Sequence, residues 1–297
     1  MADYIITCCS PVDQTPEYMQ QIGVPFAKFH FTINGQDYLD DMGQMMSYEE
    51  FYSHMEKGDK IVTSQVNPYE YEELWTPYLD KGMDVLHVCT SSGISSTYNS
   101  ANIAANEMRE KYPDRKIYIV DSVMVSGGYG LLVDTLAEKR DEGLSIDELH
   151  DWAEKNRFKC HFWFFAGQLK YLVNGGRLSK TAGLMGSLLK ICPLLYWNQK
   201  GQPIPYSKVR TVKKCAEAMV ERMVKTCRDG LDYCGKAFIT HSVAPDVAQY
   251  IADLVRSKFP RLKCEPHVTQ VGPTIGNYTG PTSLSLGFWS DVDKPVE

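Results

Sequence analysis

The chain has 297 residues, a formal net charge of -6 at pH 7 and 43% hydrophobic residues. This length is enough for two domains or one large one, and the composition is typical of a folded soluble protein. Over most of the surface the negative charge repels polyanions, so a general nucleic-acid binder would need a strong basic patch. The sequence offers one modest candidate, residues 208–214, and we expect no nucleic-acid partner.

The N-terminus and the cysteines predict a cytoplasmic protein. The first residues, MADYIITCCSPVD, contain an acid where a signal peptide needs basic residues, and no apolar run approaches the length of a membrane span. Nine cysteines, including the neighbours Cys8 and Cys9, suit reduced thiols better than a disulfide framework. Metal-binding spacings such as Cys-x-x-Cys do not occur. We therefore expect no metal, no cofactor and at most a transient membrane contact.

In the N-terminal half, local patterns predict a hairpin and two helices. Apolar and polar residues alternate within residues 24–39, and the Asn34-Gly35 pair suits a type I′ turn. Helices are predicted to begin after Ser47, which forms a capping box, and after Asn67.

The next segments predict a parallel β-α-β unit. Residues 84–90 and 116–122 have strand patterns, and apolar residues between them follow helical spacing. In such units ligands gather where a strand passes into a helix, because N–H groups of the helix N-terminus point there. Residues 90–97, TSSGISST, fall at this place and contain six hydroxyl side chains. We call this segment the hydroxyl loop.

The later segments predict a second α/β region. A glycine-rich turn is expected at residues 126–130, followed by two helices, and a new pattern near residue 160 places a domain boundary there. The predicted domains are therefore residues 1–160 and 161–297. The second is expected to contain a hairpin around 199–205, helices at 211–229 and 245–259, and strands at 236–242 and 264–272.

The hydroxyl loop supports more than one interpretation. Residues 93–97 nearly match the Gly-x-Ser-x-Gly motif of serine hydrolases, which would make Ser95 a nucleophile. However, Thr97 replaces the last glycine, and nothing in the sequence links a histidine base such as His241 or His267 to Ser95.

Structural roles are the alternative for several hydroxyls. We expect Ser91, Ser92 and Ser100 to bond loop backbone or cap the helix. Three residues at the predicted helix start stand where a ligand anion would also lie: Ser95, Ser96 and Thr97. A second hydroxyl pair, Thr63-Ser64, ends another short apolar stretch.

A series of short motifs resembles the DegV family, which includes FakB-type fatty-acid-binding proteins. In chain order the motifs are IITCCSPVD, TSQVNP, SSGISSTYNSA, IVDS with SGGYG, LKYLVNGGRLS, LLKICPLL, KVRTVKK and IGNYTGP. Each motif is weak alone, but their order and spacing over nearly the whole chain are specific.

The resemblance implies two α/β domains, the N-terminal one with a mainly parallel sheet, and a long-chain fatty acid in a tunnel between them. By motif, Thr63 and Ser95 would bind the carboxylate, while Arg177 and Arg210 would belong to a basic lining or partner face. The other implied fatty-acid-binding residues are Ser64, Ser96, Thr97, Tyr278, Thr279 and Gly280. Apolar residues within 184–191 fit a tunnel wall or a core equally well.

Some positions depart from the family pattern. Tyr278 stands where the family usually has His, Cys9 replaces an Asp, and Ser96 replaces a Gly. Tyr can donate an O–H but does not become cationic near neutral pH.

We predict a non-enzymatic fatty-acid carrier, and the resemblance adds presentation of the carboxylate to a separate fatty acid kinase. The alternatives are a serine hydrolase using Ser95 and a binder of another amphipathic acid.

Overall fold

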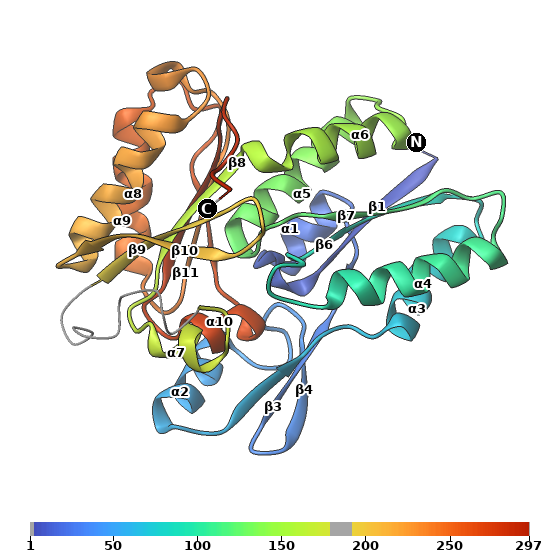
Figure 1. Ribbon diagram of the computed structural model, residues 1–297, viewed down its shortest axis with the longest axis horizontal. Coiled ribbons are helices and arrows are strands. Elements are labelled where there is room, and N and C mark those ends of the chain that lie inside the picture. Colours follow the sequence, from blue (N-terminus) through green and yellow to red (C-terminus); the bar gives the residue numbers. More distant parts are fainter. Residues whose placement is uncertain (1–2, 179–191, 297) are drawn as a thin grey trace.

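The computed structural model describes residues 3–178 and 192–296. Its N-terminal half contains a four-stranded parallel sheet in the order β2-β1-β6-β7 (Figure 1). The strands are β1 (Tyr4–Cys9), β2 (Phe26–Ala27), β6 (Asp84–Cys89) and β7 (Ile117–Asp121). They are apolar on both faces, which requires helices on both sides. The predicted β-α-β unit is confirmed, with α4 (Thr97–Lys111) between β6 and β7. Helix α3 (Pro68–Leu79) packs beside α4, and the short α1 (Pro16–Gln21) follows β1.

The C-terminal half contains a six-stranded mixed sheet in the order β10-β9-β8-β13-β11-β12. Its strands are β8 (Cys160–Phe165), β9 (Cys192–Trp197), β10 (Pro203–Val209), β11 (Ala237–His241), β12 (His267–Gln270) and β13 (Leu284–Trp289). Helices α8 (Val212–Thr226) and α9 (Pro245–Lys258) pack against this sheet (Figure 1). The predicted hairpin, two helices and two strands of this half are confirmed.

Helix α5 (Ser126–Asp141) lies between the two large sheets and contacts β1, β8, β11 and β13. It is buried on nearly all sides, as expected for a helix enclosed by apolar surfaces. The predicted glycine-rich turn at 126–130 is wrong, because these residues form the first turns of α5. A Cβ added to Gly128 would lie 2.9 Å from the ring of Phe162, so glycine here permits close helix-sheet packing. Helix α6 (Ile146–Asn156) follows, with the predicted cap at Ser145.

A third, antiparallel sheet has the order β4-β3-β5 and lies below the other two in Figure 1. It comprises β3 (Phe29–Ile33), β4 (Gln36–Asp40) and β5 (Ile61–Ser64), and α2 (Tyr48–Lys57) follows β4. Asn34 and Gly35 have φ values of 53° and 88°, which confirms the predicted hairpin turn.

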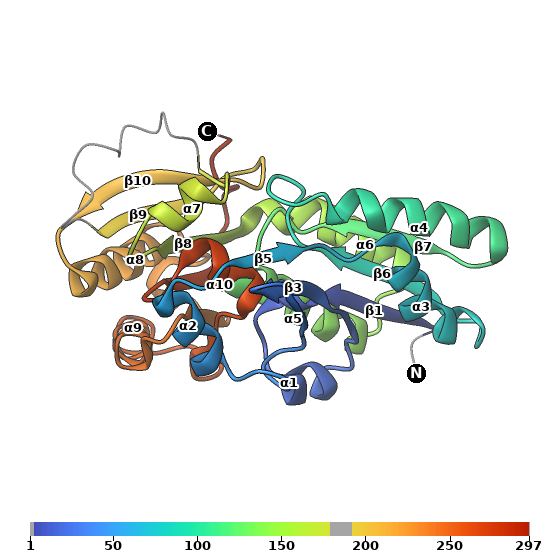
Figure 2. The same ribbon diagram turned by 90° about the horizontal axis from the view of Figure 1, so that it is seen from below.

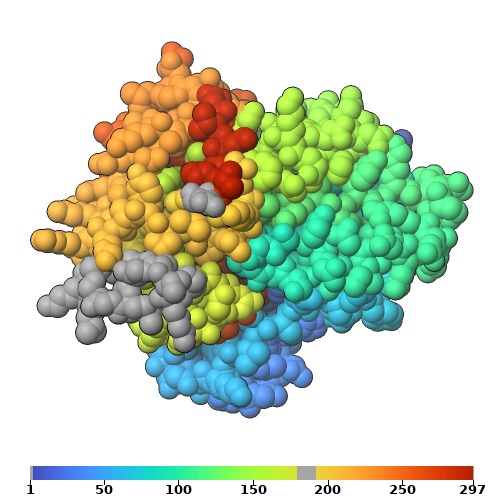
Figure 3. Space-filling model, viewed as in Figure 1, coloured from blue at the N-terminus to red at the C-terminus, as the bar shows by residue number. Residues whose placement is uncertain are grey.

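This small sheet comes from the N-terminal half of the sequence, but it packs on α10 (Pro273–Thr279) of the C-terminal half. Figure 2 shows α10 beside α2 and β5, with α7 (Lys170–Asn174) close by. Figure 3 shows the N-terminal and C-terminal surfaces meeting in the middle of the molecule. The domain ranges 1–160 and 161–297 stay a prediction.

The apolar residues predicted at 184–191 lie outside the described residues. Within the described ranges, no helix has both the length and the apolar character needed to cross a bilayer.

Candidate functional site

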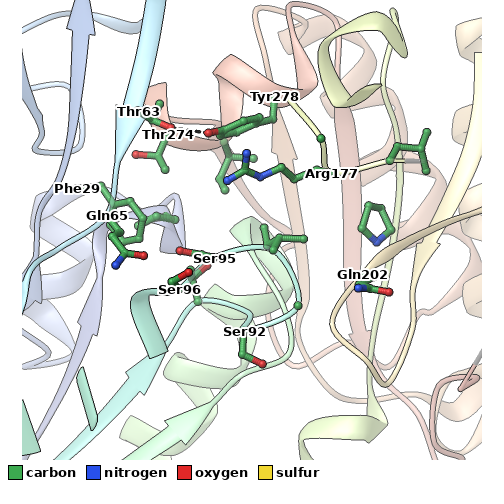
Figure 4. A pocket seen from close by; sticks show the side chains of 18 of the residues that line it. Phe29, Thr63, Gln65, Ser92, Ser95, Ser96, Arg177, Gln202, Thr274 and Tyr278 are labelled. Carbon is green, nitrogen blue, oxygen red and sulfur yellow. Dashed lines mark hydrogen bonds between the residues drawn. The ribbon is translucent and has the colours of Figure 1, made fainter. Parts of the chain in front are cut away.

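A cavity of about 800 Å³ lies where several segments of the chain meet, and five segments contribute most of its wall. They are the end of β5, the hydroxyl loop, the residues after α7, the start of β10 and helix α10. Figure 4 shows their side chains around a common space. The predicted site residues that line this cavity are Thr63, Ser64, Ser95, Ser96, Arg177 and Tyr278.

Four predicted residues do not line this cavity. Thr97 is fully buried, and its hydroxyl lies 2.5 Å from that of Tyr71, so it stabilises the start of α4 inside the N-terminal core. Arg210 is exposed beyond the end of β10. Gly280 ends α10 next to the ring of Tyr171, where an added Cβ would lie 2.3 Å from a ring carbon. Thr279 lines a separate inner pocket.

The two sides of the cavity are joined by a hydroxyl pair. Thr63 Oγ1 on β5 lies 2.7 Å from Tyr278 Oη on α10, and either oxygen can donate (Figure 4). The guanidinium of Arg177 stacks on the Tyr278 ring, 4.1 Å from its centroid, and donates to the Gly175 carbonyl at 2.6 Å. A cation held over an aromatic face keeps donors available for an anion in the same space.

The hydroxyl loop leads directly into the N-terminus of α4. Ser96 is the N-cap residue, and its side chain makes no capping bond. Ser95 Oγ accepts a long bond of 3.3 Å from the Thr97 N–H. Because the first N–H groups of a helix have no partner within the helix, this end of α4 favours an anion.

The same loop is also fixed to the β9–β10 turn. Ser91 Oγ accepts the Gly93 N–H at 3.2 Å, as expected, but it donates across the interface to the Gly201 carbonyl at 2.7 Å. A Cβ on Gly93 would lie only 2.2 Å from the Lys200 carbonyl oxygen. The predicted bond of Ser91 to loop backbone is therefore confirmed, and its hydroxyl also fixes the hairpin turn to this loop.

Ser92 and Ser100 also have partners outside the loop. Ser92 Oγ donates to Asp121 at the end of β7 at 2.5 Å, and Ser100 Oγ accepts from the side chain of Gln65 at 2.8 Å. The expected local bonds of these two serines are therefore replaced by bonds to neighbouring elements.

Sequence reasoning missed several residues of the cavity wall, including Gln65, Gln202 and Thr274. Gln65 directly follows Thr63-Ser64, so the TSQ motif was a usable signal. Thr274 is buried, and both its N–H and its hydroxyl donate to Asp40. Burial raises the pKa of Asp40 to about 6, although these bonds lower it. No motif in the sequence around Gln202 predicts that it lines the cavity. It reaches the cavity through the β9–β10 hairpin turn.

The described residues give Ser95 no histidine base. His241 Nδ1 bonds the Ala244 N–H at 3.3 Å, and His267 bonds the Gln14 side chain at 2.6 Å. Burial lowers the pKa of His267 to about 4 and also lowers that of His241. Among the residues that the structure describes, no histidine lines the cavity, so these residues do not form the triad of a serine hydrolase. Among the described residues, no cluster of three His, Cys, Asp or Glu side chains is suited to a metal.

A narrow inner pocket of about 40 Å³ adjoins the cavity. The two spaces share four wall residues, Ile94, Arg177, Ile275 and Tyr278. The inner wall is mainly apolar and comes from α5, α10 and the C-terminal sheet. The site is therefore polar outside and apolar inside, an arrangement that suits an amphipathic acid.

A family model described as "Uncharacterised protein, DegV family" matches residues 5–291. A DegV domain-containing protein from Clostridium perfringens is 32% identical over 295 residues, which covers 99% of this chain and 100% of the relative. Another from Streptococcus pyogenes serotype M3 is 32% identical over 237 residues, covering 78% of this chain and 79% of the relative.

Solved structures share the fold. A DegV family protein from Thermus thermophilus, described by its fatty acid binding, has a TM-score of 0.86 and 23% identity, with 97% of this chain and 99% of that chain covered. The Fatty Acid Kinase (Fak) B3 protein from Streptococcus pneumoniae, loaded with linoleic acid, has a TM-score of 0.83 and 22% identity, with 98% and 100% covered. These matches, with the mixed helices and sheets of this chain, confirm the predicted α/β class. On the sequence matches, this chain belongs to the DegV family.

Proposed function

We propose that this protein is a carrier that binds one long-chain fatty acid, with its carboxylate in the outer cavity and its tail in the inner pocket. The observation that carries the proposal is that the two spaces are neighbours and share Tyr278 in their walls. Hydroxyls and the N-terminus of α4 face the outer space, while the inner wall is mainly apolar.

The free energies of burial and hydrogen bonding support placing the tail in the inner pocket and the carboxylate in the outer cavity. Burying about 15 methylenes at about 0.8 kcal/mol each contributes about 12 kcal/mol, so the tail provides most of the gross affinity. An unpaired buried carboxylate would cost several kcal/mol, and hydrogen bonds from hydroxyls and backbone N–H groups offset much of that cost. The head group therefore sets orientation and discriminates against neutral lipids.

The small volume of the inner pocket limits how an acyl tail can enter it. A cavity volume of about 40 Å³ is far below the about 300–1,000 Å³ of clefts that hold drug-sized ligands. A long acyl tail therefore enters only if side chains of the inner wall move apart. The fatty acid described for the Thermus thermophilus and Streptococcus pneumoniae relatives supports such a channel in this fold.

Presentation of the carboxylate to a separate kinase is the finer part of this proposal. The Streptococcus pneumoniae relative is described as a fatty acid kinase B protein. In this chain, exposed basic residues lie near and beyond the end of strand β10, which begins at the cavity, namely Lys208, Arg210, Lys213 and Lys214. They offer an anion-binding face for a partner, which charge reversal at Arg210 would weaken.

Identification of the co-purifying ligand tests the carrier function. Purified protein is extracted with solvent and analysed by mass spectrometry, before and after incubation with palmitic and oleic acids. We expect one fatty acid per chain. Absence of any fatty acid in both samples would refute the carrier, and a different amphipathic acid at full stoichiometry would support the alternative ligand class. A fluorophosphonate probe that labels the wild type but not Ser95→Ala would instead indicate a hydrolase.

A further inference from the structure

One residue of the inner pocket wall has a buried polar atom that the fold does not satisfy. Trp197 ends strand β9, lines the inner pocket and is 4% exposed. Its indole Nε1 is buried and has no hydrogen-bond partner among the described residues. Leaving a buried N–H unpaired costs about 1–3 kcal/mol, so most buried tryptophans find an acceptor. Trp75 and Trp289 do so here, donating to Thr7 and Thr135, both at 3.2 Å or less.

The other polar side chains deep in this pocket are satisfied by one another. Thr240 Oγ1 lies 2.9 Å from Ser126 Oγ and 2.5 Å from Ser285 Oγ. Ser283 Oγ donates to Thr279 Oγ1 at 3.1 Å. The hydroxyls are thus paired, and among the described residues of the inner wall the indole N–H of Trp197 is the fully buried side-chain donor without a partner.

We propose that the ligand supplies the missing acceptor, as an oxygen carried on the acyl chain away from the carboxylate. The inference rests on the proposed carrier function and narrows its ligand class to hydroxy or oxo fatty acids. Trp197 lines the inner pocket and not the outer cavity, so the oxygen belongs to the tail. A chain oxygen that lies beside Trp197 accepts its N–H. A chain oxygen elsewhere in the inner pocket loses its hydrogen bonds to water without gaining a partner.

The neighbouring rings define the rival explanation. The ring of Phe162 lies 6.1 Å from that of Trp197 at 74°, and that of Phe164 lies 5.7 Å away at 55°. An N–H directed at an aromatic face is a weak hydrogen bond. If such a contact satisfies Trp197, an oxygen on the ligand brings no gain.

The test compares 18-carbon acids that differ only in the tail. Dissociation constants are measured for stearic acid, oleic acid and a series with one hydroxy or oxo group at successive positions, using wild type and Trp197→Phe. We expect one positional isomer to bind the wild type about tenfold more tightly than stearic acid, which corresponds to about 1.4 kcal/mol. Trp197→Phe is expected to abolish this preference, which is read as the ratio of the two dissociation constants within the variant.

Trp163→Phe is the matched control. Trp163 lies on the adjacent strand β8, is 4% exposed and does not line the inner pocket, so this variant should keep the preference. Weaker binding of every oxygenated acid by the wild type would overturn the proposal, as would a preference that survives Trp197→Phe. If the wild type prefers oleic acid to stearic acid and Trp197→Phe does not, the Trp197 N–H interacts with a double bond. That result would reject the oxygenated fatty acids as the ligand class. Failure of the wild type to bind any of these acids would refute the carrier function itself.

Discussion

Thr63 Oγ1 and Tyr278 Oη form a hydrogen bond of 2.7 Å between residues 215 positions apart in the sequence. The bond connects the small antiparallel sheet with α10 at the wall of the cavity. Each hydroxyl has one O–H, and in this pair only one of them donates to the other. A carboxylate placed beside the pair accepts from both, so the ligand would reorganise this bond.

Removing either hydroxyl should weaken fatty-acid binding. For Tyr278→Phe and Thr63→Val we expect losses of about 1–3 kcal/mol each, because a charged acceptor loses a donor. The two losses should not add in the double variant, since both residues belong to one hydrogen-bonded group. Displacement of a fluorescent fatty acid measures these affinities, with Tyr206→Phe as a control at a half-exposed tyrosine. Wild-type affinity in both single variants would remove these residues from the head-group site.

Replacing Tyr278 by the usual family residue should make binding depend on pH. A histidine at this position gains a positive charge as pH falls through about 6.5, its ordinary pKa, and attracts the carboxylate more strongly. The described part of the wild-type cavity wall contains no histidine, so we expect the wild-type affinity to stay nearly constant between pH 6.5 and 8. The same displacement assay over this range compares Tyr278→His with the wild type. A flat profile for the variant would place residue 278 away from the bound carboxylate.

Gly93→Ala should disturb the contact between the hydroxyl loop and the β9–β10 turn. The new Cβ would lie 2.2 Å from the Lys200 carbonyl oxygen and 2.5 Å from that of Gly201, and backbone cannot yield as a side chain does. We expect a loss of about 1–3 kcal/mol in the free energy of unfolding, together with weaker ligand binding. Urea unfolding measures the first effect, with Asn99→Ala at an exposed position of α4 as the control. Unchanged stability would mean that the turn is free to move away.

The sequence predicts local structure well here and long-range contacts poorly. The hairpin within 24–39 and the caps at Asn67 and Ser145 follow from residues close in the chain, and the structure has them. The segment 126–130 was misread because glycine serves turns and close helix packing alike.

The site was predictable only where a motif marks it. Thr63, Ser95 and Tyr278 lie in motifs and line the cavity, whereas Gln202 enters it only because a hairpin over 100 residues away packs on the hydroxyl loop. Thr97 lies in the same motif but is buried against Tyr71, because its place in the motif does not fix which way its side chain points.

Asp40 should make the fold more stable at mildly acidic pH. Burial raises the pKa of Asp40 from 3.8 to about 6, and burial also raises that of Asp13, which bonds the Gly272 N–H nearby. A carboxyl whose pKa is higher in the folded state binds a proton more tightly there. Its charged form therefore lowers stability increasingly as pH rises from about 4 to 6, and the full cost persists above pH 6.

Asp40→Asn should remove this cost while its amide oxygen still accepts from Thr274. We expect the variant to gain on the order of 2 kcal/mol relative to wild type on going from pH 4 to pH 8. Urea unfolding at both pH values measures the gain, with exposed Asp37→Asn on the same strand as the control. An equal effect of Asp40→Asn at the two pH values would show that Asp40 titrates normally.

Lys294 should have the opposite pH dependence. It is 2% exposed, and its Nζ donates to the Val123 carbonyl at 3.1 Å, which ties the C-terminal segment to the N-terminal half. Burial lowers the pKa of Lys294 to about 7, and Arg157 lowers it further, while Cys160 and Asp121 act to raise it. Because the folded pKa lies below the unfolded value of 10.5, the folded state binds fewer protons between them. Stability attributable to this residue therefore rises as pH increases from about 7 to 10.

Lys294→Met keeps much of the side-chain volume and removes the buried charge. Replacing a buried charge by an apolar side chain is often neutral or stabilising, but here the bond to Val123 is also lost. We expect the variant to be more stable relative to wild type at pH 6 than at pH 9, by on the order of 1–3 kcal/mol. Urea unfolding at both pH values gives this difference, and exposed Lys263→Met should show none. An equal effect at the two pH values would mean that Lys294 stays charged in the fold, which would require water or an acidic partner to reach its ammonium group.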